Sequence, residues 1–491
     1  MLAFDNLSGD AELAYFSDGV SEEIQETLAR GAELKVIGRT SAFQLRGADK
    51  TVRKAATELR ATHVLDGSVR RAGQRVRITA QLIDCANETT LWSNRFDREL
   101  TDIFALQDEI ATAVADALRI AFTPAGPAEP INPAAYDRYL KARACLQQGL
   151  ADSAAMDAAV AHFRAAVAVA PRFAKAWAEL AATIAGALSN RGLASASHAD
   201  GVAAAETALA LDPSQGVAYG ALSHLAPLGC CEDRERLLQK ALAASPTDPM
   251  ALSYMAHFCS DVGRFRAAED YARRALELDP GFMIAANWHA NTVVQQGRYE
   301  DARPLWQANL ARWPHSNIIK MNTLMTAAEV GDWTWFEAVA KTVDAAFLAT
   351  PAFRDSIDFL RNLRAPDPRF AVARLERDRR ALADAGAVRI GALIALHRLG
   401  LQEEAFELAD QSDYGFMFDT EPNAARQSPS FLFMARSAGV IRDPRALRLC
   451  AKLGLCDYWL ATDRWPDCAD DTPYDFRAEA ARVAASRARG G

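Results

Sequence analysis

Two hydrophobic periods alternate along the first 120 residues and predict helices packed on a sheet. Phe16, Val20, Ile24 and Leu28 recur every four residues, which is typical of a helix with one buried stripe, and Gly31 follows where a C-cap belongs. Short apolar or alternating runs indicate strands. The predicted order is β-α-β-α-β-β-β-α, with strands at 2–4, 35–37, 63–71, 75–84 and 91–98 and helices at 16–28, 52–59 and 103–120.

The clearest strand signal is a hairpin that turns at Ala72-Gly73-Gln74. Apolar and polar residues alternate along its second strand, with Val76, Ile78, Ala80 and Leu82 set against Arg75, Arg77, Thr79 and Gln81. Such alternation is expected of a strand that buries one face and exposes the other. The sequence therefore predicts a mixed sheet in an α/β domain.

Beyond residue 131 the pattern becomes helical and repetitive. Prolines that would close helices occur at 171, 213, 246, 280 and 314, with spacings of 42, 33, 34 and 34. Small residues recur at matching offsets before two of these prolines: Ala256, Gly263, Ala268 and Ala275 before one, and Ala290, Gly297 and Ala302 before the other. The 42-residue interval places an inserted loop at 186–197. The period predicts stacked helical pairs, because each pair has an apolar face that it cannot bury alone.

Two resemblances follow from these motifs. The 34-residue period, with the repeat ends LELDP at 276–280 and LALDP at 209–213, resembles the tetratricopeptide repeat. The first 120 residues resemble the TolB amino-terminal-like domain through FDNLSGD at 4–10, YFSDG at 15–19, VIGRTS at 36–41, LDGSVRR at 65–71, RITAQLID at 77–84 and DIFALQDEI at 102–110.

The predicted architecture is an α/β domain followed by an all-α, right-handed tetratricopeptide-like solenoid. The domain covers residues 1–122, and a Pro-rich and Gly-rich linker covers 123–131. Repeats cover 132–350, and degenerate helical repeats with a C-terminal cap cover 351–491. Few contacts are expected across the linker, and aromatic residues such as Trp459 and Trp465 are expected to pack over the last helices.

Composition narrows the function. The net charge of -8 argues against nucleic acid as the main partner, because phosphate binding usually needs a basic surface. The eight cysteines are scattered and indicate buried apolar residues rather than a disulfide or metal framework. No membrane span or signal peptide is visible. The chain as it stands indicates a cytoplasmic protein; the alternative is the extracytoplasmic part of an inner-membrane protein whose span lies upstream.

Motifs for nucleotide binding, zinc proteolysis and serine hydrolysis do not occur in the sequence. Asp5, Asn6, Asp10 and Asp18 admit a metal site, but turn and helix-capping roles explain them more simply. The sequence therefore predicts no catalytic residue, no cofactor and no bound metal.

Two candidate binding surfaces remain. In the repeat frame, Asn287, Asn291 and Gln295 share one inner-helix face beside Ser253 and His257 of the preceding repeat, where they would hydrogen-bond an extended peptide. A merely solvated face is the alternative. Arg70, Arg71, Arg75 and Arg77 form a basic patch on the hairpin, for which a solvated sheet face is again the simpler interpretation.

The predicted function is a non-catalytic protein or peptide interaction and regulatory module of a bacterial signalling protein. The resemblance implies an alternative, namely the C-terminal portion of a class III adenylate cyclase or winged-helix transcriptional regulator, with residues before Met1 completing the first strand. The expected partner is a protein or peptide, with neither nucleic acid nor a membrane span in this chain. Self-association as a scaffold is a further alternative.

Overall fold

The computed structural model describes residues 1–31, 34–123, 130–147, 153–190, 196–349, 351–420 and 427–490. Within them the chain forms two compact units whose segments alternate along the sequence. The first unit comprises 1–225, 236–252 and 274–282, and the second comprises 226–235, 253–273 and 283–491.

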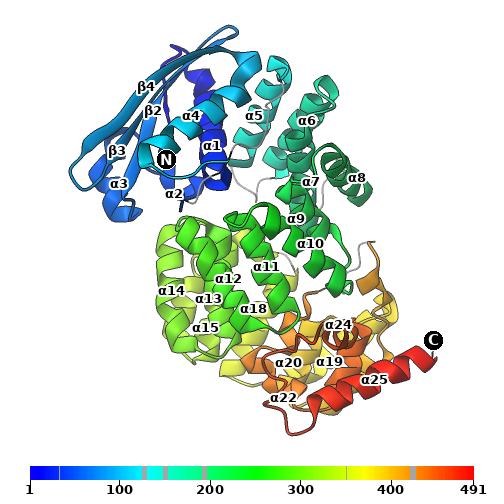
Figure 1. Ribbon diagram of the computed structural model, residues 1–491. Helices are drawn as coiled ribbons and strands as arrows, with labels where there is room; N and C mark the ends of the chain where they lie inside the picture. The colour runs from blue at the N-terminus through cyan, green and yellow to red at the C-terminus, as the bar shows by residue number, and fades with distance from the viewer. Residues whose placement is uncertain are drawn as a thin grey trace. The chain divides into compact units, whose positions relative to one another are not determined.

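A four-stranded mixed sheet opens the first unit (Figure 1). Its strands are β1 (Asp5–Asn6), β2 (His63–Ala72), β3 (Arg75–Asp84) and β4 (Thr89–Glu99), in the spatial order β1-β2-β3-β4. β1 runs parallel to β2, whereas β2, β3 and β4 are antiparallel. The predicted hairpin is confirmed, and Gly73 supplies the positive φ of +60° that its two-residue turn needs.

Helices α1 (Ala14–Gly31) and α4 (Ile103–Leu118) cover one face of the sheet (Figure 1). The predicted alternation along β3 is confirmed, since Val76, Ile78 and Ala80 are wholly buried while the residues between them are exposed or half-buried. The stripe of α1 that begins with Phe16 is buried as well. The short helices α2 (Arg39–Ala42) and α3 (Val52–Glu58) connect α1 to β2.

The strand predicted at 35–37 does not form. The Gln25 side-chain amide donates to the Ile37 carbonyl, and the Gly38 amide donates to the Leu278 carbonyl at 2.6 Å. These groups therefore serve other contacts rather than a strand ladder. Periodicity cannot show this, because both partners lie outside the segment.

The Asp279 carboxylate fixes the start of α2. It accepts the backbone amides of Thr40 at 3.0 Å and Ser41 at 2.9 Å, together with the Ser41 hydroxyl. The Gly281 amide donates to the Ser41 hydroxyl oxygen at 2.5 Å. Asp279 is only 3% exposed, so this contact between the α/β region and a repeat end is buried.

The core of the sheet continues into the following helices. One cluster of buried side chains extends from Phe4 to Leu225 and includes residues of α5 (Pro133–Gln147), α6 (Ser153–Val169), α7 (Ala174–Asn190), α8 (His198–Leu211) and α9 (Gly216–Leu225). The expectation of few contacts across the linker was therefore wrong. Most of that linker, at 124–129, and the middle of the predicted inserted loop, at 191–195, lie outside the described residues, while residues 186–190 belong to α7.

The repeat period predicted from the prolines is confirmed by three successive helical pairs. They are α11 (Pro249–Asp261) with α12 (Phe265–Leu278), α13 (Met283–Gln295) with α14 (Tyr299–Arg312), and α15 (Asn317–Glu329) with α16 (Trp333–Ala340). Gly263, Gly297 and Gly331 turn each pair with φ of +81°, +77° and +69°. Helix α10 (Cys231–Ala244) directly precedes the first pair. The residues of α10, α11 and α12 are divided between the two units.

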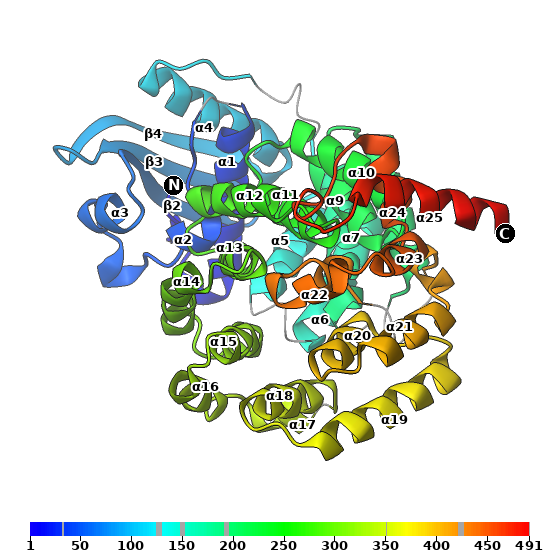
Figure 2. The same ribbon diagram turned by 90° about the horizontal axis from the view of Figure 1, so that it is seen from below.

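In the second unit, further helices follow α16, and those up to residue 411 continue from it in an arc (Figure 2). They are α17 (Ala345–Ala349), α18 (Pro351–Arg364), α19 (Pro368–Ala385), α20 (Ile390–Arg398), α21 (Gln402–Gln411), α22 (Ala438–Ile441), α23 (Ala446–Lys452), α24 (Leu455–Thr462) and α25 (Phe476–Gly490). The short turns η5 (Pro429–Leu432) and η6 (Ala435–Ser437) precede α22; η5 and α22 contact α20, and η6 contacts α13. No helix within the described ranges is both long enough and apolar enough to cross a bilayer.

Candidate functional site

The five predicted groove residues lie on α11 and α13 in the second unit, but the structure exposes them unequally. Ser253 and Gln295 are buried, at 0% and 2% exposure. His257, Asn287 and Asn291 are half-buried. Side chains that solvent cannot reach do not line an open groove, so three of the five are accessible to a partner.

His257 is held between two neighbours. Its ring stacks on Trp288 of α13 with centroids 4.5 Å apart, and its Nε2 lies 3.6 Å from Oδ1 of Asp261. Burial lowers the pKa of His257, although Asp261 opposes the effect. The ring is therefore neutral near pH 7 and acts as a hydrogen-bonding group rather than as a cation.

The third inner helix extends the same polar surface. Asn322 on α15 donates from Nδ2 to Oδ1 of Asn287 at 2.9 Å. Asn322 was not among the predicted residues, and it stands 34 positions after Trp288 rather than after one of the predicted polar residues. Extending the predicted positions of α13 by one period gives Met321, Met325 and Glu329, so the repeat frame did not indicate Asn322.

Gln295 carries an unsatisfied donor. Its Oε1 accepts from the Ser260 hydroxyl at 3.2 Å, whereas its Nε2 is buried and has no acceptor among the described residues. A buried donor without a partner costs about 1–3 kcal/mol, and a native structure seldom retains one without a reason.

Asp261 lies at the end of α11 and is completely buried. Its Oδ2 pairs with Nη2 of Arg234 at 2.9 Å, and its Oδ1 accepts the Ser428 hydroxyl. Burial on its own would raise the pKa of Asp261, but His257, Arg234 and the Ser428 hydroxyl hold it below the usual value. Asp261 is therefore a charged carboxylate with fixed partners, and the sequence pattern gave no sign of it.

The ends of all three inner helices meet segments from the C-terminal part of the second unit. Ser428 binds Asp261 at the end of α11, and a side chain added to Gly297 after α13 would meet Cβ of Ala435 at 2.9 Å. Arg398 of α20 pairs with Glu329 at the end of α15, with 2.6 Å between Nη1 and Oε1. The chain thus covers one rim of its own inner-helix surface.

The predicted C-terminal cap packs against an earlier repeat. Trp459 donates from Nε1 to the Val262 carbonyl at 3.2 Å, and the Asp467 amide donates to the Gly263 carbonyl at 3.0 Å. The aromatic residues therefore contact the turn between α11 and α12, in addition to α23 and α25 beside them.

Three of the four arginines of the predicted basic patch pair with carboxylates. Nη2 of Arg75 and Nη2 of Arg77 lie 2.8 and 2.7 Å from the two carboxylate oxygens of Asp97 on β4. Arg70 donates to the Leu7 carbonyl at 3.0 Å. The last member, Arg71, pairs with Asp137 at 2.6 Å and lies 4.9 Å over the Phe16 ring.

A buried ionic network in the first unit was missed by the sequence reasoning. Arg143 on α5 pairs with three carboxylates of α1 at 2.5–2.6 Å, and Lys175 on α7 pairs with two of them at 2.6–2.7 Å. The carboxylates belong to Glu22, Glu23 and Glu26. The Tyr139 hydroxyl also donates to Glu23 at 2.9 Å. From the sequence alone, these glutamates would be assigned to the solvent-exposed face of the helix.

Glu179 on α7 lies at the edge of this network and is half-buried. Burial raises its pKa to about 7, with Glu26 and Glu22 adding to the effect and Arg143 and Lys175 opposing it. Burial would also raise the pKa of Glu26, but Arg143 and Lys175 hold it far below its usual range. The two glutamates therefore differ in charge near neutral pH.

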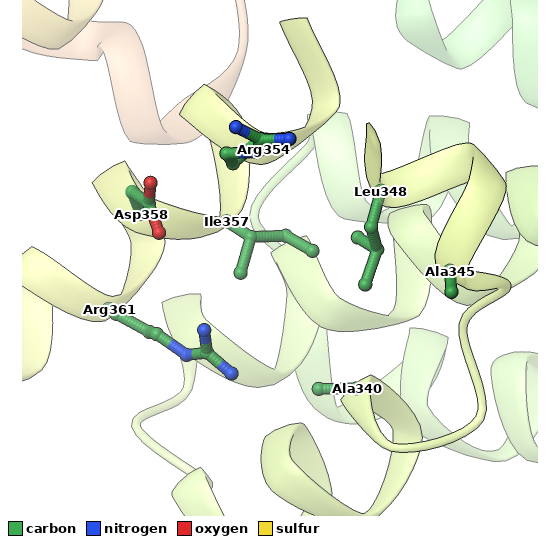
Figure 3. A pocket seen from close by; sticks show the side chains of 7 residues that line it. All are labelled: Ala340, Ala345, Leu348, Arg354, Ile357, Asp358 and Arg361. Carbon is green, nitrogen blue, oxygen red and sulfur yellow. The ribbon is translucent and has the colours of Figure 1, made fainter. Parts of the chain in front are cut away.

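Residues of α16 to α18 line an open hollow of about 370 Å³ in the second unit (Figure 3). Leu348 and Ile357 face one another across it, while Arg354, Asp358 and Arg361 surround its edge (Figure 3). Arg361 lies 3.7 Å from Glu337. None of the predicted site residues lines this hollow.

The acidic residues of the first loop have structural roles. The Asn6 side chain donates to the Asp10 carbonyl at 2.7 Å, Asp10 accepts the Glu12 amide at 2.9 Å, and Asp18 pairs with Arg46 at 2.8 Å. Among the described residues, no three His, Cys, Asp or Glu side chains cluster as metal ligands.

Comparison with known proteins gives partial matches. No model of a known protein family matches the chain. The chain is 44% identical over 154 residues to "Putative adenylate cyclase 3" of Rhizobium meliloti (strain 1021), covering 30% of this chain and 26% of that protein. It is 38% identical over 82 residues to the chloroplastic PsbB mRNA maturation factor Mbb1 of Chlamydomonas reinhardtii, covering 17% of this chain and 11% of that one. The chain thus spans about a quarter of the first relative and less of the second.

Two solved structures are similar at low TM-scores. The APC/C hetero-tetramer Cut9-Hcn1 gives a TM-score of 0.36 at 15% identity, over 47% of this chain and 46% of that one. The human IFIT1 dimer with PPP-AAAA gives 0.37 at 14% identity, over 63% of this chain and 79% of that one.

Proposed function

We propose that this chain is a non-catalytic protein or peptide interaction and regulatory module, with the inner faces of α11, α13 and α15 as its binding surface. The observation that carries the proposal is a group of half-buried polar side chains on these three inner helices, His257, Asn287, Asn291 and Asn322. Stacked helical pairs present such inner faces to extended partners.

This group suits a peptide backbone. Amide side chains can donate and accept at the same time, and His257 is neutral near pH 7 because burial lowers its pKa. Uncharged groups pair with backbone N–H and C=O groups without an ionic desolvation cost. We therefore expect an extended segment rather than a charged terminus as the ligand.

A second proposal concerns the parent protein. We propose that the α/β part is a TolB amino-terminal-like domain and that the chain is the C-terminal portion of a class III adenylate cyclase or a winged-helix regulator. The relative named as an adenylate cyclase favours the cyclase over the regulator. The match covers only 26% of that protein, so a longer parent protein would leave room for a separate output domain. Sequencing the genomic DNA around codon 1 tests this proposal, and an upstream reading frame without either output domain would contradict it.

The binding surface is tested by Asn291→Ala combined with His257→Ala. A partner is first isolated on the full chain and identified, and its affinity is then measured by calorimetry. We expect at least a tenfold loss, because a peptide would lose hydrogen bonds worth about 1 kcal/mol each together with the stacked ring.

The matched control is Gln307→Ala combined with His315→Ala, which removes the same types of group from exposed positions on and after α14. Its affinity should equal that of the wild type, and circular dichroism should show both double variants folded. Equal affinity of the groove variant and the wild type would contradict the assignment of the surface.

A further inference from the structure

The Ser428 hydroxyl occupies a position where the inner-helix surface can recognise a ligand. It donates to Oδ1 of Asp261, while Oδ2 of the same carboxylate is taken by Arg234. Because Asp261 is completely buried, Oδ1 also needs a donor; Nε2 of His257 lies 3.6 Å away, and a segment 167 positions later in the chain provides the hydrogen bond. Oδ1 is therefore the acceptor to which the side chain of a ligand would donate its hydrogen bond.

Ser428 itself has the backbone conformation of an extended peptide, and the 3-10 helix η5 begins directly after it. Ser428 has φ of -54° and ψ of 130° and precedes Pro429, which favours this polyproline-like conformation. Gln427 accepts the Gly391 amide of α20 at 2.8 Å through Oε1. Residues 427–430 thus bridge α11 and α20 by side-chain contacts.

The fit of this segment is incomplete. Gln295 lies beside Ser260, which is next to Asp261 in the chain, and its buried Nε2 receives no acceptor from the described part of the chain. A ligand that also placed a carbonyl at Nε2 would remove this penalty. The internal segment should therefore bind less tightly than a complete partner.

We propose that residues 427–430 are an internal ligand of the repeat surface, and that the surface accepts an extended peptide presenting an uncharged serine or threonine to Asp261. The inference rests on the proposed function, whose partner class it defines. An external peptide competes with the internal segment. Phosphorylation of the recognised hydroxyl blocks binding, because a phosphate would be placed against a buried carboxylate.

The probe is a fluorescein-labelled peptide with the sequence of residues 427–434, QSPSFLFM. Its binding to the full-length chain is followed by fluorescence anisotropy. The wild type is compared with Ser428→Glu, which sets a carboxylate against Asp261, and with the milder Ser428→Ala, which only removes the hydroxyl. We expect both variants to bind the probe at least tenfold more tightly than the wild type, because the internal competitor is weakened.

Three control peptides test the chemistry on the same variants: one with phosphoserine for the first serine, one with alanine there, and one with a scrambled sequence. Each should bind at least tenfold more weakly than the probe. Equal binding of the probe to the wild type and to both variants would overturn the proposal, and so would equal binding of the probe and its alanine form.

The outcome also separates this inference from the proposed function. If a partner identified by capture needs His257 and Asn291 but the probe never binds, the internal ligand is refuted while the binding surface stands. If the probe binds as expected but no cellular partner depends on that surface, the internal ligand stands and the recognition function fails.

Discussion

Asp279 illustrates how one buried carboxylate fixes a neighbouring loop. It receives two backbone amides and one hydroxyl from Thr40 and Ser41. Asp279→Ala leaves these donors buried without an acceptor, so we expect a loss of about 2–4 kcal/mol in the free energy of unfolding, measured in urea.

The corresponding residue of an earlier repeat end provides the control for Asp279. Asp212 is half-buried, and its carboxylate accepts hydrogen bonds from its chain neighbours Ser214 and Gln215. Asp212→Ala should cost less than about 1 kcal/mol. Equal losses for the two variants would contradict a special role for Asp279.

Glu179 should make stability depend on pH. Its folded pKa of about 7 lies above the ordinary value of 4.5, so the folded state binds the proton more tightly than the unfolded state does. The stability that this group contributes is present below pH 4.5 and is lost as pH rises through 7.

Glu179→Gln removes the ionisation. Relative to the wild type, the variant should gain about 1–2 kcal/mol in the free energy of unfolding between pH 5 and pH 8, a value reduced because the side chain is only half-buried. Urea titrations of both proteins at several pH values measure this difference. If the free energy of unfolding of the two proteins changed with pH in parallel, Glu179 would not be the source of the pH dependence.

The charged residues also mark the limit of prediction at this scale. The apolar stripe of α1 was predicted because a period of about 3.6 residues is visible in the sequence. The burial of Glu22 and Glu23 was not, because it depends on Arg143 and Lys175, more than a hundred residues away. Local patterns carry no information about such partners.

At the scale of elements, the hairpin and the 34-residue repeats could be predicted because glycine, proline and small residues recur at fixed offsets. The absence of a strand at 35–37 could not be predicted, because it depends on the hydrogen bond from the Gly38 amide to the distant Leu278 carbonyl. Among the groove residues, the repeat frame placed His257 and Asn291 on the inner helices. It gave no sign that Ser253 and Gln295 are buried, because burial depends on neighbouring helices and on chain segments from outside the frame.

Gly263 and Gly331 form a matched pair for testing how the C-terminal region docks. Both have positive φ and both follow an inner helix, but a Cβ on Gly331 would meet nothing within 4 Å, whereas one on Gly263 would lie 2.7 Å from Cβ of Pro466. Gly331→Ala should cost about 1 kcal/mol for the backbone alone.

Gly263→Ala should cost about 1–3 kcal/mol more than Gly331→Ala, because it adds an overpacked contact to the same backbone strain. It should also increase hydrogen exchange in residues 455–467. Urea unfolding and hydrogen exchange with mass spectrometry measure both effects. Equal stability of the two alanine variants would argue against tight docking at Gly263.

At the scale of the whole molecule, the continuous core predicts that the α/β region does not behave as a free domain. If a specific protease site is inserted within 124–129 and cut under native conditions, the two pieces should stay together during size-exclusion chromatography. The reason is that side chains from Phe4 to Leu225 form one buried cluster. Elution of a folded fragment of residues 1–122 would contradict this expectation.

The alternation of the two units along the chain has a consequence for how the gene can change. Because 236–252 and 274–282 belong to the first unit while the segments between and after them belong to the second, the chain passes from one unit to the other several times. A single recombination point between α10 and α12 would therefore leave both products with incomplete cores. Any gene fusion that transfers this architecture intact has to carry residues from the first strand to beyond α12 as one inherited block.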